Sequence, residues 1–212
     1  MAKVVVITGG RRGIGKSIVD KFLTEGYFVA SCSKNEVNLD KPNLLLMKCD
    51  VSKLSDVKKF YNKVIKKFSS VDILVNNAGV AFNRKLEEVS IDEIDLTLDT
   101  NLKGLIYFTK IFLDKLKESN GFIINIASVA GLKGYSDLSV YCASKFGVVG
   151  FSESLRKELK KVKVYCICPG PVATDMWTGL GWIKYPGITK PSNIADKVFD
   201  CVVNKPKDLI IK

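Results

Sequence analysis

Short, continuous apolar runs alternate along the chain with longer segments in which apolar residues recur every three or four positions. A continuous run is typical of a strand buried on both faces, and the longer spacing is typical of an amphipathic helix. The runs predict strands near residues 3–8, 27–32, 44–49, 71–76, 122–127, 162–168 and 208–211. The spacing predicts helices near residues 13–25, 53–68, 91–118, 138–160 and 192–203. Residues 33–43 are too few and too polar for a crossover helix, so we predict a loop there.

This alternation predicts the α/β class, with a doubly wound parallel sheet of about seven strands and helices on both faces. No repeat, low-complexity tract or linker divides the 212 residues, so we expect residues 1–212 to form a single domain. Ligands of such sheets bind outside the carboxyl ends of the strands. Glycines and polar residues follow the predicted strands at 9–15, 33–34, 50, 76–79, 128 and 169–171. We therefore expect the functional site at this edge of the sheet.

The first strand runs directly into a glycine-rich turn, Gly9 to Gly15, with the spacing G-x-x-x-G-x-G. Glycines let the backbone turn tightly and approach a pyrophosphate closely. The helix that follows directs free N–H groups and the positive end of its dipole at the anion. The turn therefore predicts a dinucleotide site in a Rossmann-type domain, although taken alone it also fits an ordinary strand-to-helix connection.

The chain carries a net charge of +11, from 33 Lys and Arg against 22 Asp and Glu. Within residues 57–68, the apolar residues share one helical face and the lysines occupy the opposite face. This pattern indicates a solvated helix face first and a docking surface for acidic partners second. It argues against nucleic acid as a partner.

The apolar runs are too short for a membrane segment, because none approaches the ~20 residues that span a bilayer. The apolar start of the chain is only a few residues long and leads into the glycine turn, unlike a signal peptide. We therefore expect a cytoplasmic protein that does not associate with membranes.

Histidine is absent from the sequence. Its absence excludes Ser-His-Asp and Cys-His catalysis and removes the commonest transition-metal ligand. The six cysteines are dispersed, form no C-x-x-C pair and mostly lie in apolar runs, where free thiols behave as small core residues. The sequence thus predicts no metal site and no disulfide framework, and it leaves acid–base chemistry to Tyr, Lys, Asp, Glu or Cys.

Four side chains suit such chemistry. Tyr141 and Lys145 lie four residues apart on a predicted helix, where the ammonium would lower the pKa of the phenol from about 10 and make it a proton donor to a carbonyl. Such a pair also occurs by chance on helix surfaces. Ser128 follows a predicted strand and could bond the same carbonyl oxygen, although serine there is usually a turn residue. Asn101 interrupts an apolar helical stripe, so it either bonds to backbone or faces a site.

Together these residues resemble the short-chain dehydrogenase/reductase family over nearly the whole chain. The resemblance is carried, in the family's order and spacing, by TGGRRGIG at 8–15, Asp50-Val51, NNAG at 76–79, Asn101, Ser128, YCASK at 141–145 and PGPVAT at 169–174. It implies that Tyr141 is the general acid of reduction and the general base of oxidation, and that Lys145 lowers its pKa and binds the nicotinamide ribose. It also implies that Ser128 polarises the substrate carbonyl and that Asn101 holds a water linking Lys145 to a proton relay.

The resemblance further implies a nicotinamide cofactor. The residues expected to bind it are Gly9, Arg11, Arg12, Gly13, Ile14, Gly15, Ser33, Lys34, Asp50, Val51, Asn77, Ala78, Gly79, Tyr141, Lys145, Pro169, Gly170, Val172 and Thr174. NAD enzymes of this architecture carry a carboxylate about twenty residues beyond the glycine turn, where this chain has Ser33 and Lys34. These residues and Arg12 suit a 2′-phosphate, so we expect NADP(H).

We expect residues 175–190 to form a short substrate region. Its large apolar residues are Met176, Trp177, Leu180, Trp182, Ile183 and Tyr185. This composition predicts a mobile lid over an apolar ketone or aldehyde, with an ordinary surface helix as the alternative.

The sequence therefore predicts an NADPH-dependent carbonyl reductase that acts on a small carbonyl or alcohol substrate. A 3-oxoacyl-[acyl-carrier-protein] reductase is a more specific alternative, in which the basic surface docks an acidic carrier protein. A non-enzymatic NADP(H)-binding sensor is an alternative of another class. By the resemblance, helices 91–118 and 138–160 form a dimer interface, and a homodimer or homotetramer is expected.

Overall fold

The structure is a computed structural model that describes residues 2–35, 39–176 and 187–211. These residues form an eight-stranded sheet in the order β3-β4-β2-β1-β5-β6-β7-β8. The strands are β1 (Val4–Thr8), β2 (Phe28–Ser33), β3 (Leu39–Lys41), β4 (Leu44–Lys48), β5 (Ile73–Asn76), β6 (Phe122–Ile126), β7 (Lys163–Ile167) and β8 (Ile210–Ile211). Every neighbouring pair is parallel except β3 with β4. From β1 the chain adds strands first on one side, as β2, β4 and β3, and then on the other, as β5 to β8. This order confirms the predicted doubly wound α/β sheet.

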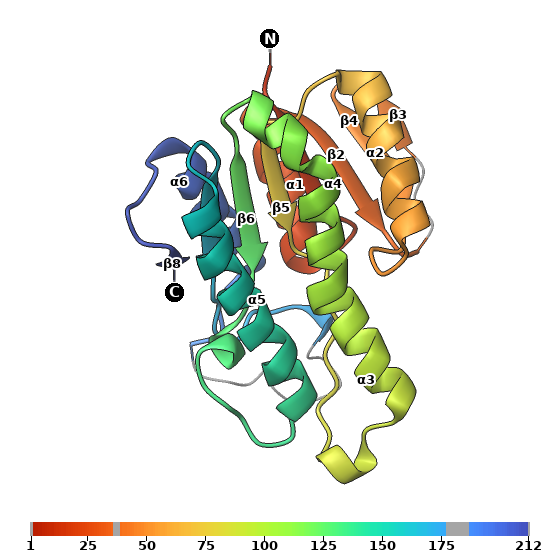
Figure 1. Cartoon of the computed structure of the whole chain (residues 1–212), viewed down its shortest axis with the longest axis vertical. Helices are drawn as coiled ribbons and strands as arrows, with labels where there is room; N and C mark the ends of the chain where they lie inside the picture. The colour runs from red at the N-terminus through yellow and green to blue at the C-terminus, as the bar shows by residue number, and fades with distance from the viewer. Residues whose placement is uncertain (1, 36–38, 177–186, 212) are drawn as a thin grey trace.

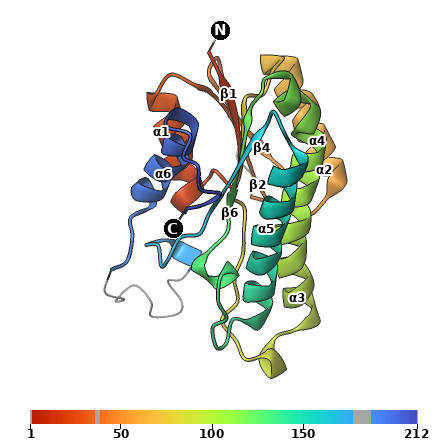
Figure 2. The same cartoon turned by 60° about the vertical axis from the view of Figure 1, so that its left-hand side comes forward.

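Helices cover both faces of the sheet, as Figures 1 and 2 show from two directions. On one face α1 (Gly13–Thr24) packs against α6 (Pro191–Val203). The other face carries α2 (Leu54–Phe68), α4 (Gly104–Glu118) and α5 (Ser139–Glu158). α3 (Ile91–Leu98) extends the line of α4 beyond the carboxyl edge of the sheet. None of the described helices is long and apolar enough to cross a membrane.

Burial on both faces explains the continuous apolar runs, since all residues of β1 and β6 are buried. On one face Ile18, Phe22 and Val198 are fully buried and join the strands to α1 and α6. On the other face Phe60 and Phe108 do the same for α2 and α4. Apolar residues at helical spacing thus cover both sides of a sheet that has no polar face.

The predicted loop over residues 33–43 contains an additional strand. β3 pairs antiparallel with β4, and Leu39 lies opposite Leu46. All three residues of β3 are exposed, so this edge strand buries too little surface to leave an apolar run in the sequence. The sheet therefore has eight strands, where the hydrophobic pattern predicted about seven.

The helix predicted over residues 91–118 is wound in three parts, because a π-helical turn, Asp99–Lys103, separates α3 from α4. Turns of this kind are frequent at functional sites. Asn101 lies within the turn, and a Cβ added at Gly104 would lie 2.8 Å from Val51 Cγ2. The polar interruption of the apolar stripe thus coincides with a change in winding that the periodicity alone did not predict.

Candidate active site

A cavity of about 700 Å³ opens where β1, β2, β4, β5, β6 and β7 end. It is lined by every residue that the sequence predicted to bind the cofactor, and also by Ser128. The parallel topology brings these distant motifs to one edge, as expected. Asn101 is the predicted site residue that is not part of the cavity wall, and it is only 1% exposed.

The glycine turn between β1 and α1 lines one end of the cavity. Gly9 and Gly13 have φ angles of +74° and +55°, a conformation that favours glycine. A Cβ added at Gly15 would lie 2.2 Å from the carbonyl oxygen of Gly9, so this close approach requires glycine. The turn and the N-terminus of α1 therefore fit a pyrophosphate, which backbone N–H groups can bind here.

Thr8 and Asn77 hold the glycine turn against the loop after β5. The Oγ1 atom of Thr8 accepts hydrogen bonds from the backbone N–H groups of Asn77 at 2.9 Å and Ala78 at 3.0 Å. The side-chain amide of Asn77 donates in return to the carbonyl oxygen of Thr8 at 2.9 Å. The sequence did not select Thr8 as a site residue, although it begins the TGGRRGIG motif. Its role is to fix the geometry of the turn.

Two cations at this end of the cavity pair with carboxylates. Arg12 Nη1 lies 3.7 Å from Asp175 Oδ2, and Lys34 Nζ lies 3.4 Å from Asp50 Oδ2. Burial opposes the ionisation of Asp50, but hydrogen bonds from Ser52 and the charge of Lys34 outweigh it, so the pKa of Asp50 lies below its ordinary value. The side chains of Arg12 and Lys34 are 65% and 64% exposed, so both can turn toward a bound anion.

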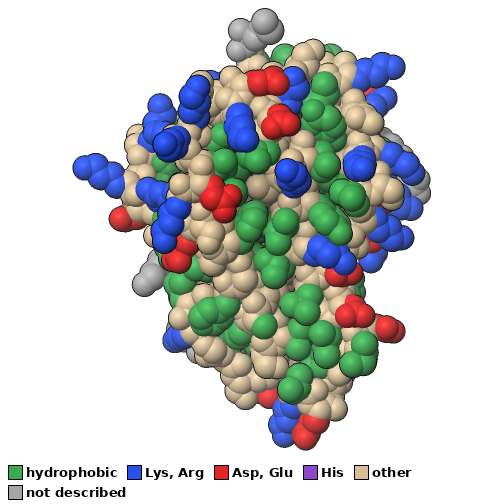
Figure 3. Space-filling view, viewed as in Figure 1, with side chains coloured by type: hydrophobic (Ala, Val, Ile, Leu, Met, Phe, Trp, Pro, Cys, Tyr) green, Lys and Arg blue, Asp and Glu red, His purple; other side chains and the backbone are tan. Residues whose placement is uncertain are grey.

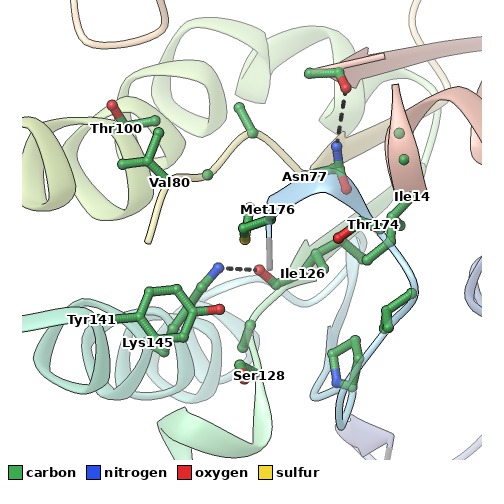
Figure 4. A pocket seen from close by; sticks show the side chains of 18 of the residues that line it. Ile14, Asn77, Val80, Thr100, Ile126, Ser128, Tyr141, Lys145, Thr174 and Met176 are labelled. Carbon is green, nitrogen blue, oxygen red and sulfur yellow. Dashed lines mark hydrogen bonds between the residues drawn. The ribbon is translucent and has the colours of Figure 1, made fainter. Parts of the chain in front are cut away.

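Tyr141 in α5 and Ser128 after β6 lie close together at the other end of the cavity, as Figure 4 shows. Tyr141 is buried, and burial raises the pKa of its phenol to about 12, although a hydrogen bond with Ser128 acts in the opposite direction. The Ser128 hydroxyl also accepts a hydrogen bond from the backbone N–H of Ala130 at 3.1 Å. At neutral pH Tyr141 is therefore a protonated phenol.

Lys145 lies one helical turn after Tyr141, with its ammonium 5.7 Å from the centre of the tyrosine ring. Its Nζ donates a hydrogen bond to the carbonyl oxygen of Ile126 at 2.9 Å, drawn as a dashed line in Figure 4. Burial lowers the pKa of Lys145 to about 8, against the opposing influence of Cys166 and Cys168. The ammonium is thus fixed in place in a site that disfavours its charge.

The predicted lowering of the Tyr141 pKa by Lys145 is wrong for the chain by itself. The ammonium bonds to a backbone carbonyl, and the loss of solvent around the phenol has the larger effect on its pKa. The spacing of the two residues predicted their proximity, whereas the burial that dominates the pKa depends on the whole fold.

Asn101 lies behind the cavity and ties the loop after β5 to α5. Its Oδ1 accepts from the N–H of Val80 at 2.8 Å, and its Nδ2 donates to the carbonyl of Val80 at 2.9 Å and to Ser144 Oγ at 3.0 Å. A Cβ added at Gly79 would lie 3.2 Å from Asn101 Oδ1 and 3.7 Å from Lys145 Nζ. Glycine at this position keeps open the space between the amide and the ammonium.

The cavity also has lining residues that sequence reasoning did not select. They include Val80, Leu96, Thr100, Val129, Ala130, Lys133, Tyr135 and Leu138. None of them belongs to a recognised motif, and none departs from the hydrophobic or polar character expected at its position. The sequence therefore gave no reason to select them. Most are apolar, which is typical of a small-molecule site.

The predicted lid falls only partly within the described residues. Asp175 and Met176 line the cavity, and Thr189 forms a parallel bridge with Val172. Residues 177–186, which hold the aromatic side chains of the predicted lid, lie outside the described residues.

Residues 3–181 match the family model described as short chain dehydrogenase. The chain belongs to this family. Several curated relatives support the assignment over most of their length. The 3-oxoacyl-[acyl-carrier-protein] reductase of Mus musculus is 36% identical over 184 residues, 83% of this chain and 78% of the relative. The L-fucose dehydrogenase of Bos taurus is 36% identical over 186 residues, 84% of this chain and 69% of the relative.

Carbonyl reductase family member 4 of Xenopus tropicalis is a further relative of this short-chain dehydrogenase, 35% identical over 189 residues, 85% of this chain and 80% of the relative. Among solved structures, an alcohol dehydrogenase from the archaeon Thermococcus sibiricus, complexed with 5-hydroxy-NADP, superimposes with a TM-score of 0.85 and 28% identity, over 100% of this chain and 94% of that chain. The chain is therefore an oxidoreductase of a family that uses nicotinamide cofactors.

Proposed function

We propose that this short-chain dehydrogenase is an NADPH-dependent oxidoreductase that interconverts a carbonyl compound and its alcohol. The observation that carries the proposal is that Ser128, Tyr141 and Lys145 line the same cavity as the glycine turn. When bound, the nicotinamide supplies or accepts the hydride, while the chain supplies orientation and proton transfer. The positive φ angles of Gly9 and Gly13 and the close approach at Gly15 suit the pyrophosphate of that cofactor.

In the reductive direction, Ser128 and Tyr141 hold the substrate carbonyl oxygen by hydrogen bonds, and Tyr141 donates the proton. A pKa of about 12 keeps the phenol protonated at neutral pH, as a proton donor requires. Lys145, with a pKa of about 8, carries its charge at neutral pH and lies close enough to stabilise the phenolate that remains. Oxidation of an alcohol uses the same groups in reverse.

Asn101 supports proton return to Tyr141 indirectly. Its amide and the ammonium of Lys145 border the space that Gly79 leaves open. A water in this space would have polar partners on two sides, which a buried water needs. In this proposal the water passes a proton toward Lys145, and Asn101 is the residue that positions it.

The preference for NADP(H) rests on the end of the cavity beside the glycine turn. Ser33, Lys34 and Arg12 line it where an NAD site of this architecture would carry a carboxylate on the ribose. The two cations are exposed and suit a phosphate once they leave their present carboxylate partners. The complex of the Thermococcus relative with 5-hydroxy-NADP supports the same choice.

The apolar walls beside Tyr141, formed by residues such as Val80, Leu96 and Leu138, favour an apolar ketone or aldehyde. Two observations favour a 3-oxoacyl-[acyl-carrier-protein] reductase as the second candidate. The mouse relative carries that name. The exposed lysines of α2 offer a basic surface to an acidic carrier protein; they are Lys58, Lys59, Lys63 and Lys66.

We further infer a homodimer or homotetramer formed through the face that carries α3, α4 and α5. Leu98, Ile106 and Phe146 on these helices are 37%, 37% and 47% exposed. Figure 3 shows apolar side chains spread over this face, with most of the basic side chains over its upper half. Burial of such apolar surface between two copies would stabilise the dimer.

The test of the proposed function is turnover of a panel of apolar ketones and aldehydes, acyl thioesters and sugars with NADPH and with NADH. We expect NADPH oxidation with apolar carbonyls and slower turnover with NADH. Turnover of sugars but not of apolar carbonyls would contradict the substrate class. Tight binding of NADPH without turnover of any carbonyl would instead favour the non-enzymatic sensor.

A further inference from the structure

The catalytic end of the cavity carries a positive charge that the proposed chemistry does not use. Lys133, in the loop after β6, lines the cavity and is exposed. Its ammonium lies 5.1 Å from the centre of the Tyr135 ring. The face of an aromatic ring attracts a cation without neutralising its charge. Tyr135 therefore favours one position of the ammonium and leaves it able to bind an anion.

The position of Lys133 is tied to the catalytic phenol through Tyr135. Tyr135 packs against the apolar cluster of Ala130, Leu138 and Tyr141 and lines the same cavity. The backbone N–H of Lys133 bonds to the carbonyl of Val129 at 3.2 Å, directly after Ser128. Lys133 thus lines the cavity five residues after Ser128, and its ammonium lies over a ring that packs on the cluster containing Tyr141.

The charges around this end are unbalanced. In the described part of the chain, the carboxylates that line the cavity are Asp50 and Asp175, and they pair with Lys34 and Arg12 at the other end. The nearest acidic residue to Lys133 in sequence, Asp137, is exposed and is not part of the described cavity lining. A neutral apolar substrate would leave the charge of Lys133 without a function in binding.

We propose that Lys133 binds a carboxylate of the substrate and thereby sets the substrate class. The preferred substrate is then a carbonyl compound with an apolar body and a carboxylate at the end remote from the carbonyl. The apolar walls hold the body, Ser128 and Tyr141 hold the carbonyl, and Lys133 pairs with the carboxylate at the rim. This inference rests on the proposed oxidoreductase function and narrows it.

The test compares reduction of 4-formylbenzoate with reduction of its methyl ester by NADPH. We expect the wild-type chain to prefer the acid, and Lys133→Met to lower the acid-to-ester ratio of kcat/KM about tenfold, mainly through KM. Lys133→Arg should retain most of the preference, because it conserves the charge. Added KCl should weaken the preference in the wild type, since the rim is exposed to solvent.

Lys161→Met is the matched control, because it removes the same charge from an exposed position just before β7, at the opposite edge of the sheet from the cavity. It should keep the wild-type ratio. An equal fall in Lys161→Met and Lys133→Met, or an unchanged ratio in Lys133→Met, overturns the inference while the oxidoreductase function stands.

If the wild-type chain reduces neither 4-formylbenzoate nor its methyl ester, the affinity for a carboxylate ligand tests the role of Lys133 independently of the proposed oxidoreductase function. The product-like acid 4-(hydroxymethyl)benzoate is then titrated calorimetrically into the NADP+-loaded wild type and Lys133→Met. About tenfold weaker binding to the variant supports a carboxylate site at Lys133. Equal binding, or no binding to either protein, overturns it.

Discussion

The cavity holds the two cations beside its glycine turn and the buried cation beside Tyr141 in opposite ways. Beside the glycine turn, Arg12 and Lys34 are about two-thirds exposed and each pairs with a carboxylate. Beside Tyr141, Lys145 is 5% exposed, bonds to a backbone carbonyl and has a pKa of about 8. The exposed cations beside the glycine turn can thus change partners, whereas the buried ammonium of Lys145 is fixed.

In the proposed function this difference assigns separate tasks to the two sets of cations: the exposed ones bind a cofactor phosphate, and the buried one serves proton transfer. The Arg12–Asp175 pair is exposed on both sides, and such pairs contribute only ~0–1 kcal/mol, so Arg12 can exchange its carboxylate for a phosphate at little cost. The side chain of Lys34 is as exposed, and its partner Asp50, which is 14% exposed, also accepts hydrogen bonds from Ser52 that do not depend on Lys34. A buried ammonium cannot leave its site, and its surroundings set its protonation instead. Changes at the exposed cations should therefore alter which cofactor binds, and changes near Lys145 should alter proton transfer and its pH dependence.

The largest effect is expected beside the buried ammonium. Tyr141→Phe removes the proton donor but keeps the buried ring, so kcat should fall about 10³-fold while the affinity for NADPH changes little. Steady-state kinetics and fluorescence titration with NADPH measure the two quantities. A variant that keeps full activity would refute the role of Tyr141.

The next effect concerns the backbone of the glycine turn. Gly15→Ala places a Cβ 2.2 Å from the carbonyl oxygen of Gly9, so NADPH affinity should fall about 100-fold as the turn deforms. Gly150→Ala is the control, because a Cβ there meets no atom of another described segment within 4 Å. Circular dichroism checks that both variants fold. Equal NADPH affinity in the two variants would show that the close approach is unimportant.

The pKa of Lys145 predicts a change of stability with pH. Its value falls from 10.5 in the unfolded chain to about 8 in the folded one, so the unfolded chain binds more protons between these values. The free energy of unfolding should therefore rise by about 2 kcal/mol from pH 8 to pH 10 through this group. The raised pKa of Tyr141 acts in the opposite direction only above about pH 10.

Urea unfolding at pH 8 and pH 10 isolates this contribution when the wild type is compared with Lys145→Met. Other groups titrate in both proteins and cancel in the difference. The wild type should gain about 2 kcal/mol more than the variant over this range. Equal gains would mean that Lys145 keeps an ordinary pKa in the folded chain.

The smallest effect is expected at the exposed cations beside the glycine turn. Arg12→Ala combined with Lys34→Asp removes both cations and adds a carboxylate after β2, where an NAD enzyme carries one. The ratio of kcat/KM for NADPH to that for NADH should fall about tenfold or more. A wild-type preference for NADH, or an unchanged ratio in the variant, would contradict the assignment of these residues to a 2′-phosphate.

Much of the fold, and the glycine turn at one end of the cavity, could be predicted because the signals are local. Buried parallel strands leave continuous apolar runs, and the glycines at 9, 13 and 15 are required by backbone geometry within one turn. β3 escaped prediction because an exposed edge strand leaves no such run. The π turn at Asp99–Lys103 escaped because the apolar spacing of a helix does not distinguish π from α winding, and its neighbours Val51 and Val80 come from other segments.

The sequence alone established the α/β sheet, the edge at which the motifs meet and the pairing of Tyr141 with Lys145, since each follows from periodicity or spacing within a short segment. Tertiary structure decided the direction of both pKa shifts, placed Asn101 behind the cavity wall and brought Lys133 and Tyr135 to its rim. The physical reason is that desolvation and charge balance are sums over groups from distant segments, which no local pattern records.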